Sequence, residues 1–313
     1  MLNRRILRIK AFKVLYAYAQ NPELSLKEAL AALDASCEAV RGEYLYLLGL
    51  IPALTAESAR RIEAARGKFN PTEEDLHPNM KFAQNGLSAL LEKDPDFLRL
   101  TEKHHFSWEN NDVFLHKLYE TLKTRAYYRK YMESGRTSLK EDAALWREIF
   151  ARELEDDEDL AAILEDVSIH WADDLPYALG CCIRSIDESG RSERWDFPPL
   201  YQSDILKARG KEAQSDREFV HALLTAAYGR YGEYHDLVAA SVSKWDQDRL
   251  YVTDIVLIAL GLAEAETFPD IPVRVSINEY VEIAKYYSTP KSRTFVNGLL
   301  DKLIKERVNN KTV

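Results

Sequence analysis

The chain has 313 residues, of which 46% are hydrophobic and 30% are charged, a composition typical of folded globular proteins rather than disordered ones. No apolar run approaches the roughly 20 residues that a membrane-spanning helix needs, so we expect no membrane insertion. The net charge is −9, yet the segment 1–20 contains five cations and no acid, which leaves −14 for the rest of the chain. This asymmetry favours a localised polyanion-binding site on a basic N-terminal arm. The five cations are Arg4, Arg5, Arg8, Lys10 and Lys13.

The N-terminus and the cysteines both favour a cytoplasmic protein. Lys10 and Lys13 interrupt the apolar stretch that a secretory signal would need, and no small-residue cleavage site follows. Cys181 and Cys182 are adjacent, which is poor geometry for a structural disulfide or a metal site, and Cys37 stands alone. We therefore expect two of the three cysteines to be small core residues.

Helical periodicity begins with the first residues. One apolar stripe predicts a helix that ends near Asn21-Pro22, and its members are Leu7, Ala11, Val14, Leu15 and Tyr18. Ser25 and Glu28 have the spacing of a capping box and predict the start of a second helix. A third helical run covers residues 43–65, with a break or kink near Pro52.

The middle of the chain alternates between helices and connectors. Residues 70–78 hold two prolines and several acids and predict a loop, and the periodicity is weak over residues 93–111. Residues 114–131 predict another helix, and residues 190–199 predict a connector that ends at Pro198-Pro199. Strand-like alternation is limited to short stretches such as residues 273–277, so the predicted fold class is all-α.

Two segments of the chain match each other without gaps, the first beginning at Asp142 and the second at Asp216. Each reads as two apolar helices, a tryptophan and a third helix, with Trp171 falling on Trp245 and Tyr177 on Tyr251. Helices share a periodicity, so chance alignment is one explanation. The aromatic matches favour a duplication, or convergent packing of helical layers, and predict repeated helical units that bury a continuous core.

The C-terminal third carries two distinctive segments, IPVRVSINEYVEIAKYYS and SRTFVNGLLDKLI. They resemble the signature of the NusB family, in which a proline-preceded valine leads to "aINEavelAK" and then to "s..FVNGvLd". The upstream family pattern is matched by Trp245, Asp248-Arg249, Asp254, Leu257 and Glu264. The N-terminus resembles the family's opening helix, "RR..R..A.q.LY", through Arg4-Arg5, Arg8, Ala11 and Leu15-Tyr16.

The resemblance implies a NusB-like helical bundle in residues 201–313 and a basic helix, residues 1–20, that packs on it. Residues 21–200 are then a helical insertion, because NusB proteins are commonly less than half as long as this chain. The resemblance also implies a bacterial transcription antitermination factor that is not an enzyme. NusB proteins bind boxA RNA of ribosomal RNA leaders together with the ribosomal protein NusE, and act on RNA polymerase.

The first helix supplies one half of the RNA site that we expect. Arg4, Arg5, Arg8, Lys10 and Lys13 would reach phosphates, and Tyr16 would lie close to the RNA. Phe12 shares this side of the helix, but we expect it to be a core residue.

The second half of the site would come from Lys291, Ser292, Arg293, Phe295 and Asn297. Pro290 and Ser292 predict a helix start, where free N–H groups favour a phosphate and Ser292 could equally be a plain cap. For Phe295 two roles are equally compatible with the sequence, packing in the core and stacking on a base. Asn278, Glu279 and Glu282 predict either another helix start capped by Asn278 or a surface for the protein partner.

We expect no catalytic centre, cofactor or metal. His104-His105 lacks the spacing of a histidine metal pair, and the chain has no P-loop, dinucleotide-binding or nucleophile-elbow motif. The main alternative to an RNA-binding factor is a protein-interaction scaffold with a weak RNA site. Self-association of the chain is compatible with both the RNA-binding factor and the scaffold.

Overall fold

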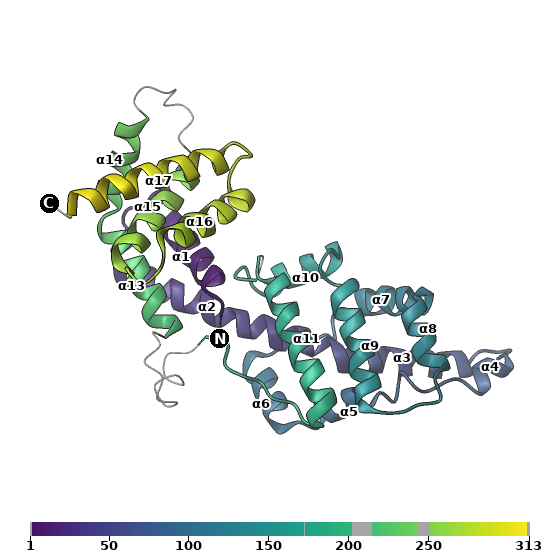
Figure 1. Cartoon of the computed structure of the whole chain (residues 1–313). Coiled ribbons are helices and arrows are strands. Elements are labelled where there is room, and N and C mark those ends of the chain that lie inside the picture. Colours follow the sequence, from purple (N-terminus) through teal and green to yellow (C-terminus); the bar gives the residue numbers. More distant parts are fainter. Residues whose placement is uncertain (1, 172, 202–214, 243–250, 312–313) are drawn as a thin grey trace. The chain divides into compact units, whose positions relative to one another are not determined.

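The computed structural model describes residues 2–171, 173–201, 215–242 and 251–311, without the side chains of residues 308–311. Its regular elements in these ranges are helices, and no strand occurs among them, which confirms the all-α prediction (Figure 1). None of the described helices is both long and apolar enough to cross a membrane. Trp245, Asp248 and Arg249, which carry part of the family pattern, lie outside the described residues.

The chain divides into two compact units. Unit 1 comprises Met1–Glu38 and Leu200–Val313, and unit 2 comprises Ala39–Pro199. The division falls inside helix α2 (Leu26–Leu48), so its first part belongs to unit 1. The insertion expected from the sequence begins earlier, at residue 21.

Unit 1 is built around α15 (Val252–Thr267), which is buried without a break from Asp254 to Glu264. A helix that is apolar all round must be covered on all sides, and five helices pack against this one. They are α1 (Arg4–Gln20), α13 (Asp216–Gly229), α14 (Tyr231–Ser241), α16 (Val273–Tyr287) and α17 (Ser292–Lys311). Gly261 permits the closest approach, because a Cβ there would lie 2.7 Å from a methyl group of Leu300.

Helix α1 packs against α13 and α15 (Figure 1). Its stripe residues Leu7, Ala11 and Leu15 are fully buried. Asn3 caps the helix by accepting a hydrogen bond from the backbone N–H of Ile6 at 2.8 Å. The N-terminal helix is therefore part of the C-terminal bundle, although the whole of unit 2 lies between them in the sequence.

Unit 2 contains the end of α2 and a series of shorter helices. The pair α9 (Leu139–Arg152) and α11 (Leu175–Ser192) packs most extensively. Trp146 of α9 is fully buried, and its indole N–H donates to Asn85 at 3.0 Å. The remaining helices are α3 (Leu50–Arg66), α4 (Glu73–Leu76), α5 (Gly86–Glu92), α6 (Pro95–His104), α7 (Asp112–Thr124), α8 (Ala126–Glu133) and α10 (Glu158–Val167).

The two segments that match in the sequence form similar helical pairs. Residues 142–164 fall on α9 and α10, and residues 216–238 fall on α13 and α14. Several matched residues are buried in both copies: Leu145 and Phe219, Trp146 and Val220, Ile149 and Leu223, Phe150 and Leu224, Leu160 and Tyr234, Leu164 and Val238. Common burial agrees with repeated units, and duplication itself stays a prediction.

Several element boundaries differ from the sequence predictions. The helix break predicted near Pro52 is present and lies three residues earlier, at Gly49, because a proline is tolerated in the first turn of a helix, where N–H groups have no partner. Residues 70–78 include the short helix α4, which a Thr72–Asp75 capping box stabilises.

Other differences concern helix length. The run at residues 114–131 is two helices separated at Arg125, the weak region at residues 93–111 contains α6, and α11 extends into the predicted connector as far as Ser192. The strand-like residues 273–277 form the first turns of α16.

Candidate nucleic-acid interface

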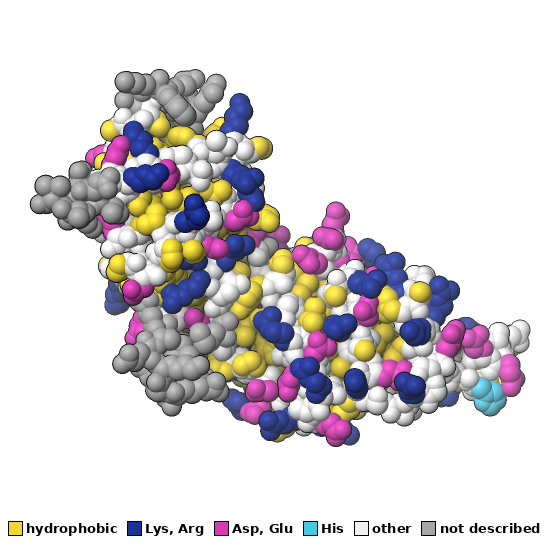
Figure 2. All heavy atoms as spheres, in the orientation of Figure 1, with side chains coloured by type: hydrophobic (Ala, Val, Ile, Leu, Met, Phe, Trp, Pro, Cys, Tyr) yellow, Lys and Arg dark blue, Asp and Glu magenta, His cyan; other side chains and the backbone are white. Residues whose placement is uncertain are grey.

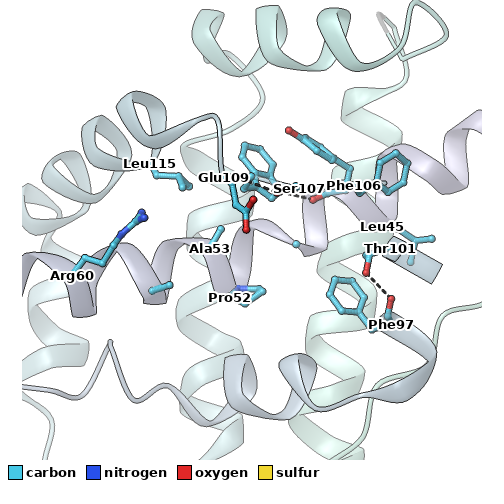
Figure 3. Close-up of a pocket in the computed structure, with 14 residues that line it drawn as sticks. Leu45, Pro52, Ala53, Arg60, Phe97, Thr101, Phe106, Ser107, Glu109 and Leu115 are labelled. Atoms are coloured by element: carbon cyan, nitrogen blue, oxygen red, sulfur yellow. Dashed lines mark hydrogen bonds between the residues drawn. The ribbon is translucent and has the colours of Figure 1, made fainter. Parts of the chain in front are cut away.

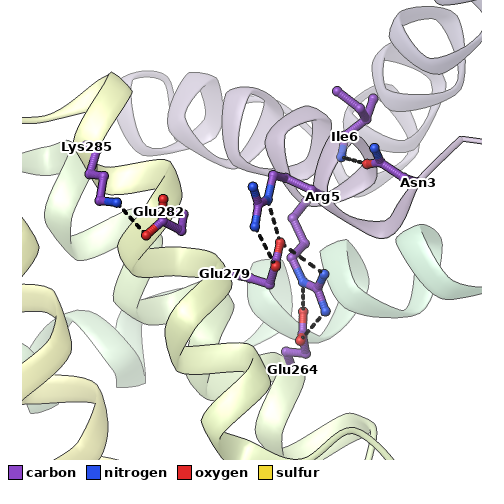
Figure 4. Close-up of polar contacts among 8 residues, drawn as sticks. Asn3, Arg5, Ile6, Glu264, Glu279, Glu282 and Lys285 are labelled. Atoms are coloured by element: carbon purple, nitrogen blue, oxygen red, sulfur yellow. Dashed lines mark hydrogen bonds and ion pairs between the residues drawn. The ribbon is translucent and has the colours of Figure 1, made fainter. Parts of the chain in front are cut away.

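The basic arm on α1 does not present all of its cations to solvent. Arg8 is buried, with 4% of its side chain exposed, and it donates two hydrogen bonds of 2.7 Å to the carboxylate of Glu264 (Figure 4). Glu264 is fully buried and also accepts from the hydroxyls of Ser276 and Tyr280, at 2.7 and 2.9 Å. Burial is the largest single influence and lowers the pKa of Arg8, but the pKa is raised because the bonds to Glu264, together with the charge interactions with Tyr280, Glu264 and Glu279, outweigh burial. Arg8 thus fastens α1 to α15 instead of presenting its charge at the surface, and its contact with RNA stays a prediction.

Two further predicted cations, Arg4 and Lys10, also pack against neighbouring helices, and their contacts with RNA stay predictions. Lys10 is fully buried, so its ammonium group is not at the surface. Arg4 is half-buried, and its guanidinium lies 3.9 Å from the centre of the Phe219 ring on α13. Burial lowers the pKa of Arg4, and the charge of Asp216 partly offsets this. Arg4 and Lys10 thus serve the packing of α1 rather than an exposed basic surface.

Arg5 remains at the surface, with 49% of its side chain exposed. It donates two hydrogen bonds, of 2.9 and 2.8 Å, to the carboxylate of Glu279 on α16 (Figure 4). These bonds raise the pKa of Arg5, and Glu282 and Tyr286 add smaller electrostatic contributions in the same direction. Arg5 is therefore an accessible cation that α16 holds in place.

Lys13, Tyr16 and Phe12 lie further along α1. Lys13 and Tyr16 are half-buried, so each has an exposed part. Phe12 is 3% exposed, which agrees with the core assignment, and its ring centre lies 5.2 Å from that of Tyr287 on α16. The aromatic contact brings the middle of α1 against the end of α16.

The second half of the predicted site lies at the start of α17. Lys291, Arg293 and Asn297 are exposed, and Phe295 is half-buried. Ser292 is an exception, since it is 2% exposed and its hydroxyl donates to the buried carboxylate of Asp254 at 2.8 Å. Ser292 therefore fastens α17 to α15, and its contact with RNA stays a prediction.

The two halves of the predicted RNA site, on α1 and at the start of α17, both lie next to α16. The pKa of Glu282 on α16 is lowered, first by its 2.5 Å bond from Lys285 and then by the charges of Lys285, Arg293 and Arg5. Arg5 and Arg293, separated by most of the sequence, thus act on one carboxylate. We give the name α1/α16/α17 surface to the following exposed or half-buried residues in or next to these three helices: Arg5, Lys13, Tyr16, Lys285, Tyr286, Lys291, Arg293, Phe295 and Asn297.

Two members of this surface were missed in the sequence. Lys285 and Tyr286 are exposed, and Tyr286 is the more prominent at 83%. The helical periodicity of the sequence indicates the exposure of Tyr286, because Ile277, Tyr280 and Ala284 form the buried stripe of α16 and Tyr286 falls outside it. The predicted helix start at Asn278 concealed it: α16 begins at Val273, so Asn278 lies in its second turn and is not the cap.

The pockets of unit 2 differ in their lining from the basic α1/α16/α17 surface. The one in Figure 3 is mainly apolar and aromatic, lined by residues that include Tyr46, Pro52, Phe97, Phe106 and Trp108. In the described ranges, no three histidine, cysteine or acidic side chains come together as a metal site. His104 instead stacks on Phe106, with ring centres 5.1 Å apart.

Comparison with known proteins addresses the same part of the chain. The sequence model of the NusB family matches residues 193–305. A protein of Methylacidiphilum infernorum (isolate V4), named "Transcription antitermination protein NusB", is 38% identical over 112 residues, which cover 36% of this chain and 70% of that protein. A protein of the same name from Salinibacter ruber (strain DSM 13855 / M31) is 33% identical over 93 residues, which cover 30% of this chain and 58% of that protein. No solved structure matches the chain. Unit 1 thus carries all but the first seven residues of the matched region, and the chain belongs to the NusB family.

Proposed function

We propose that this protein is a transcription antitermination factor that binds single-stranded RNA through the α1/α16/α17 surface. Its RNA would be of the boxA type found in ribosomal RNA leaders, and NusE would bind alongside it. The complex would help RNA polymerase in the cytoplasm to read through terminators. The observation that supports the proposal is that Arg5 of α1 and Arg293 of α17 both act on the Glu282 carboxylate of α16, with the exposed Tyr286 on the same helix, in the unit that contains most of the NusB match.

The chemistry of this surface suits an unpaired strand. Exposed arginine and lysine side chains attract phosphates, and aromatic rings stack on bases that are free of a duplex. Glu279 and Glu282 also lie here, but Arg5 and Lys285 pair with them, which limits their repulsion of RNA. The names of the two relatives, both antitermination proteins, support the same assignment.

A gel-shift experiment with the full chain tests the proposal. The RNAs are a boxA oligonucleotide and a scrambled oligonucleotide of equal composition, each with and without NusE. We expect the boxA RNA to bind more tightly and NusE to enhance the difference. Equal binding of both RNAs under both conditions would reject the proposal.

One observation favours a second candidate, a protein-interaction scaffold. Unit 2 contains 21 lysine and arginine residues against 31 aspartate and glutamate residues, whereas unit 1 contains 21 against 20. The acidic excess of the protein therefore resides in unit 2, which suits a basic protein partner better than RNA. Retention of a transcription-complex protein by a chain that binds neither RNA would favour this candidate.

A further inference from the structure

Tyr286 is an exposed aromatic side chain of the α1/α16/α17 surface. Among the large hydrophobic side chains of this surface it is the most exposed, at 83%, although a tyrosine at the end of an amphipathic helix would usually pack its ring against a neighbour. The adjacent Tyr287 does so, with its ring centre 5.2 Å from that of Phe12. Tyr287 thus anchors the end of α16 to α1, and this leaves Tyr286 on a supported helix with its ring in solvent.

The position of Tyr286 along α16 places it in line with the charged residues. Glu279, Glu282 and Tyr286 are three and four residues apart, which is the spacing of one helical face. Seven residues correspond to about 10 Å of helix, so the ring lies about two turns beyond the carboxylate that holds Arg5. A strand whose phosphate contacts Arg5 could therefore place a nearby base over Tyr286.

The two acids on this face, Glu279 and Glu282, are each paired with a cation. Arg5 holds Glu279 with two hydrogen bonds, and Lys285 holds Glu282 at 2.5 Å (Figure 4). The ring of Tyr286 consequently stands among paired charges, and Arg293 approaches from the start of α17. An exposed ring beside cations is the arrangement with which proteins hold single-stranded nucleic acid.

We propose that Tyr286 is a base-stacking residue that makes the α1/α16/α17 surface selective for unpaired RNA. The inference rests on the proposed function, because it assigns a role within that RNA site. The ring contributes stacking, and the surrounding cations contribute phosphate contacts. Loss of the ring should therefore weaken binding without changing its dependence on salt.

The test measures the dissociation constant of the full chain for a fluorescent single-stranded boxA oligonucleotide at several salt concentrations. Tyr286→Ala should weaken binding about fivefold or more, given the usual contribution of one stacked base. Tyr286→Phe should bind like the unchanged protein, because it keeps the ring. Phe69→Ala is the matched control, since Phe69 is 98% exposed in unit 2 and its removal should have no effect.

A set of oligonucleotides, each with one abasic nucleotide, identifies the stacked base. At one position the abasic RNA should weaken binding by the unchanged protein and have no further effect on Tyr286→Ala. An unaltered affinity of Tyr286→Ala, while Arg293→Gln still weakens binding, would overturn the stacking role and leave the proposed function standing. An equal loss in Tyr286→Phe would also overturn it. Absence of RNA binding by the unchanged protein would reject both.

Discussion

At the scale of single residues, the structure separates two kinds of arginine on α1. Arg8 is enclosed with Glu264, whereas Arg5 pairs with Glu279 at the surface. Removing one partner of a buried ion pair leaves an uncompensated charge in a medium of low polarity, which is costly. Exposed pairs are screened by water and contribute little.

Glu264→Ala should therefore lower the free energy of unfolding by about 3–5 kcal/mol, because Arg8 would stay buried without its carboxylate. Ser276 and Tyr280 would also lose their acceptor. Urea denaturation followed by circular dichroism measures the change. Glu188→Gln is the control, because Glu188 and its partner Arg191 are both exposed, and it should cost less than about 1 kcal/mol. Equal losses in the two variants would show that the buried pair has no special role.

The sequence alone could not distinguish these arginines. Both belong to the RR..R pattern, and the partner of Arg8 is 256 residues away. By contrast, the stripe of Leu7, Ala11 and Leu15 predicted the buried face of α1, because periodicity is a local property. Ser292 was predicted at the start of a helix, and it lies there, but its bond to Asp254 depends on tertiary packing.

At the scale of elements, close helix packing depends on small residues. Gly190 of α11 faces α9, where an added Cβ would collide with the Cβ of Ala143 and lie 3.2 Å from the carbonyl oxygen of Leu139. Gly180 of the same helix would meet only the end of Arg184, at 3.7 Å. The two glycines therefore differ in packing while sharing one helix.

Gly190→Ala should lower the free energy of unfolding by about 1–3 kcal/mol, because backbone and Cβ atoms must move apart. Gly180→Ala should be neutral or stabilising by up to about 1 kcal/mol, since alanine favours a helix over glycine. Thermal unfolding of both variants provides the comparison. A Gly190→Ala protein as stable as Gly180→Ala would contradict the packing of α9 on α11.

The contact between α14 and α17 should depend on pH. Arg230 and Arg307 bond to Glu233 and lower its pKa from an ordinary value of 4.5 to about 2. A lowered pKa means that the unfolded chain takes up the proton first, so this stabilisation is present above about pH 4.5 and is lost as the pH falls toward 2. Urea denaturation between pH 5 and pH 2 should show a weaker loss of stability in Glu233→Gln than in the unchanged protein. Identical pH profiles would contradict the assignment.

Element boundaries were predictable where capping residues mark them. Ser25 and Glu28 form the predicted reciprocal bonds at the start of α2, with Ser25 N–H to Glu28 at 2.9 Å. The start of α16 was misplaced because Val273 and Val275 are exposed at its first turns, so the buried periodicity begins only at Ser276. Misplacing this start removed Tyr286 from the predicted site.

At the scale of the whole molecule, the family match and the charge distribution concern different units. Unit 1 carries most of the NusB match and has nearly balanced charge, and the residue count places the acidic excess in unit 2. On the face drawn in Figure 2, basic and acidic side chains are interspersed. Overall composition concealed this division, because the net charge of −9 is a sum over both units. RNA affinity should therefore arise from a local group of cations and decrease with salt.

The central claim is that α1 and α17 contribute to one RNA surface. The most direct measurement is the salt dependence of boxA RNA binding by the full chain carrying Arg5→Gln, Arg293→Gln or both. Each single change should weaken binding and reduce the slope of log affinity against log salt by about 0.7, and the double change should reduce it further. Lys123→Gln, in unit 2, is the control and should leave the slope unchanged. A loss of affinity on changing only one of the two arginines, or neither, would contradict a composite site.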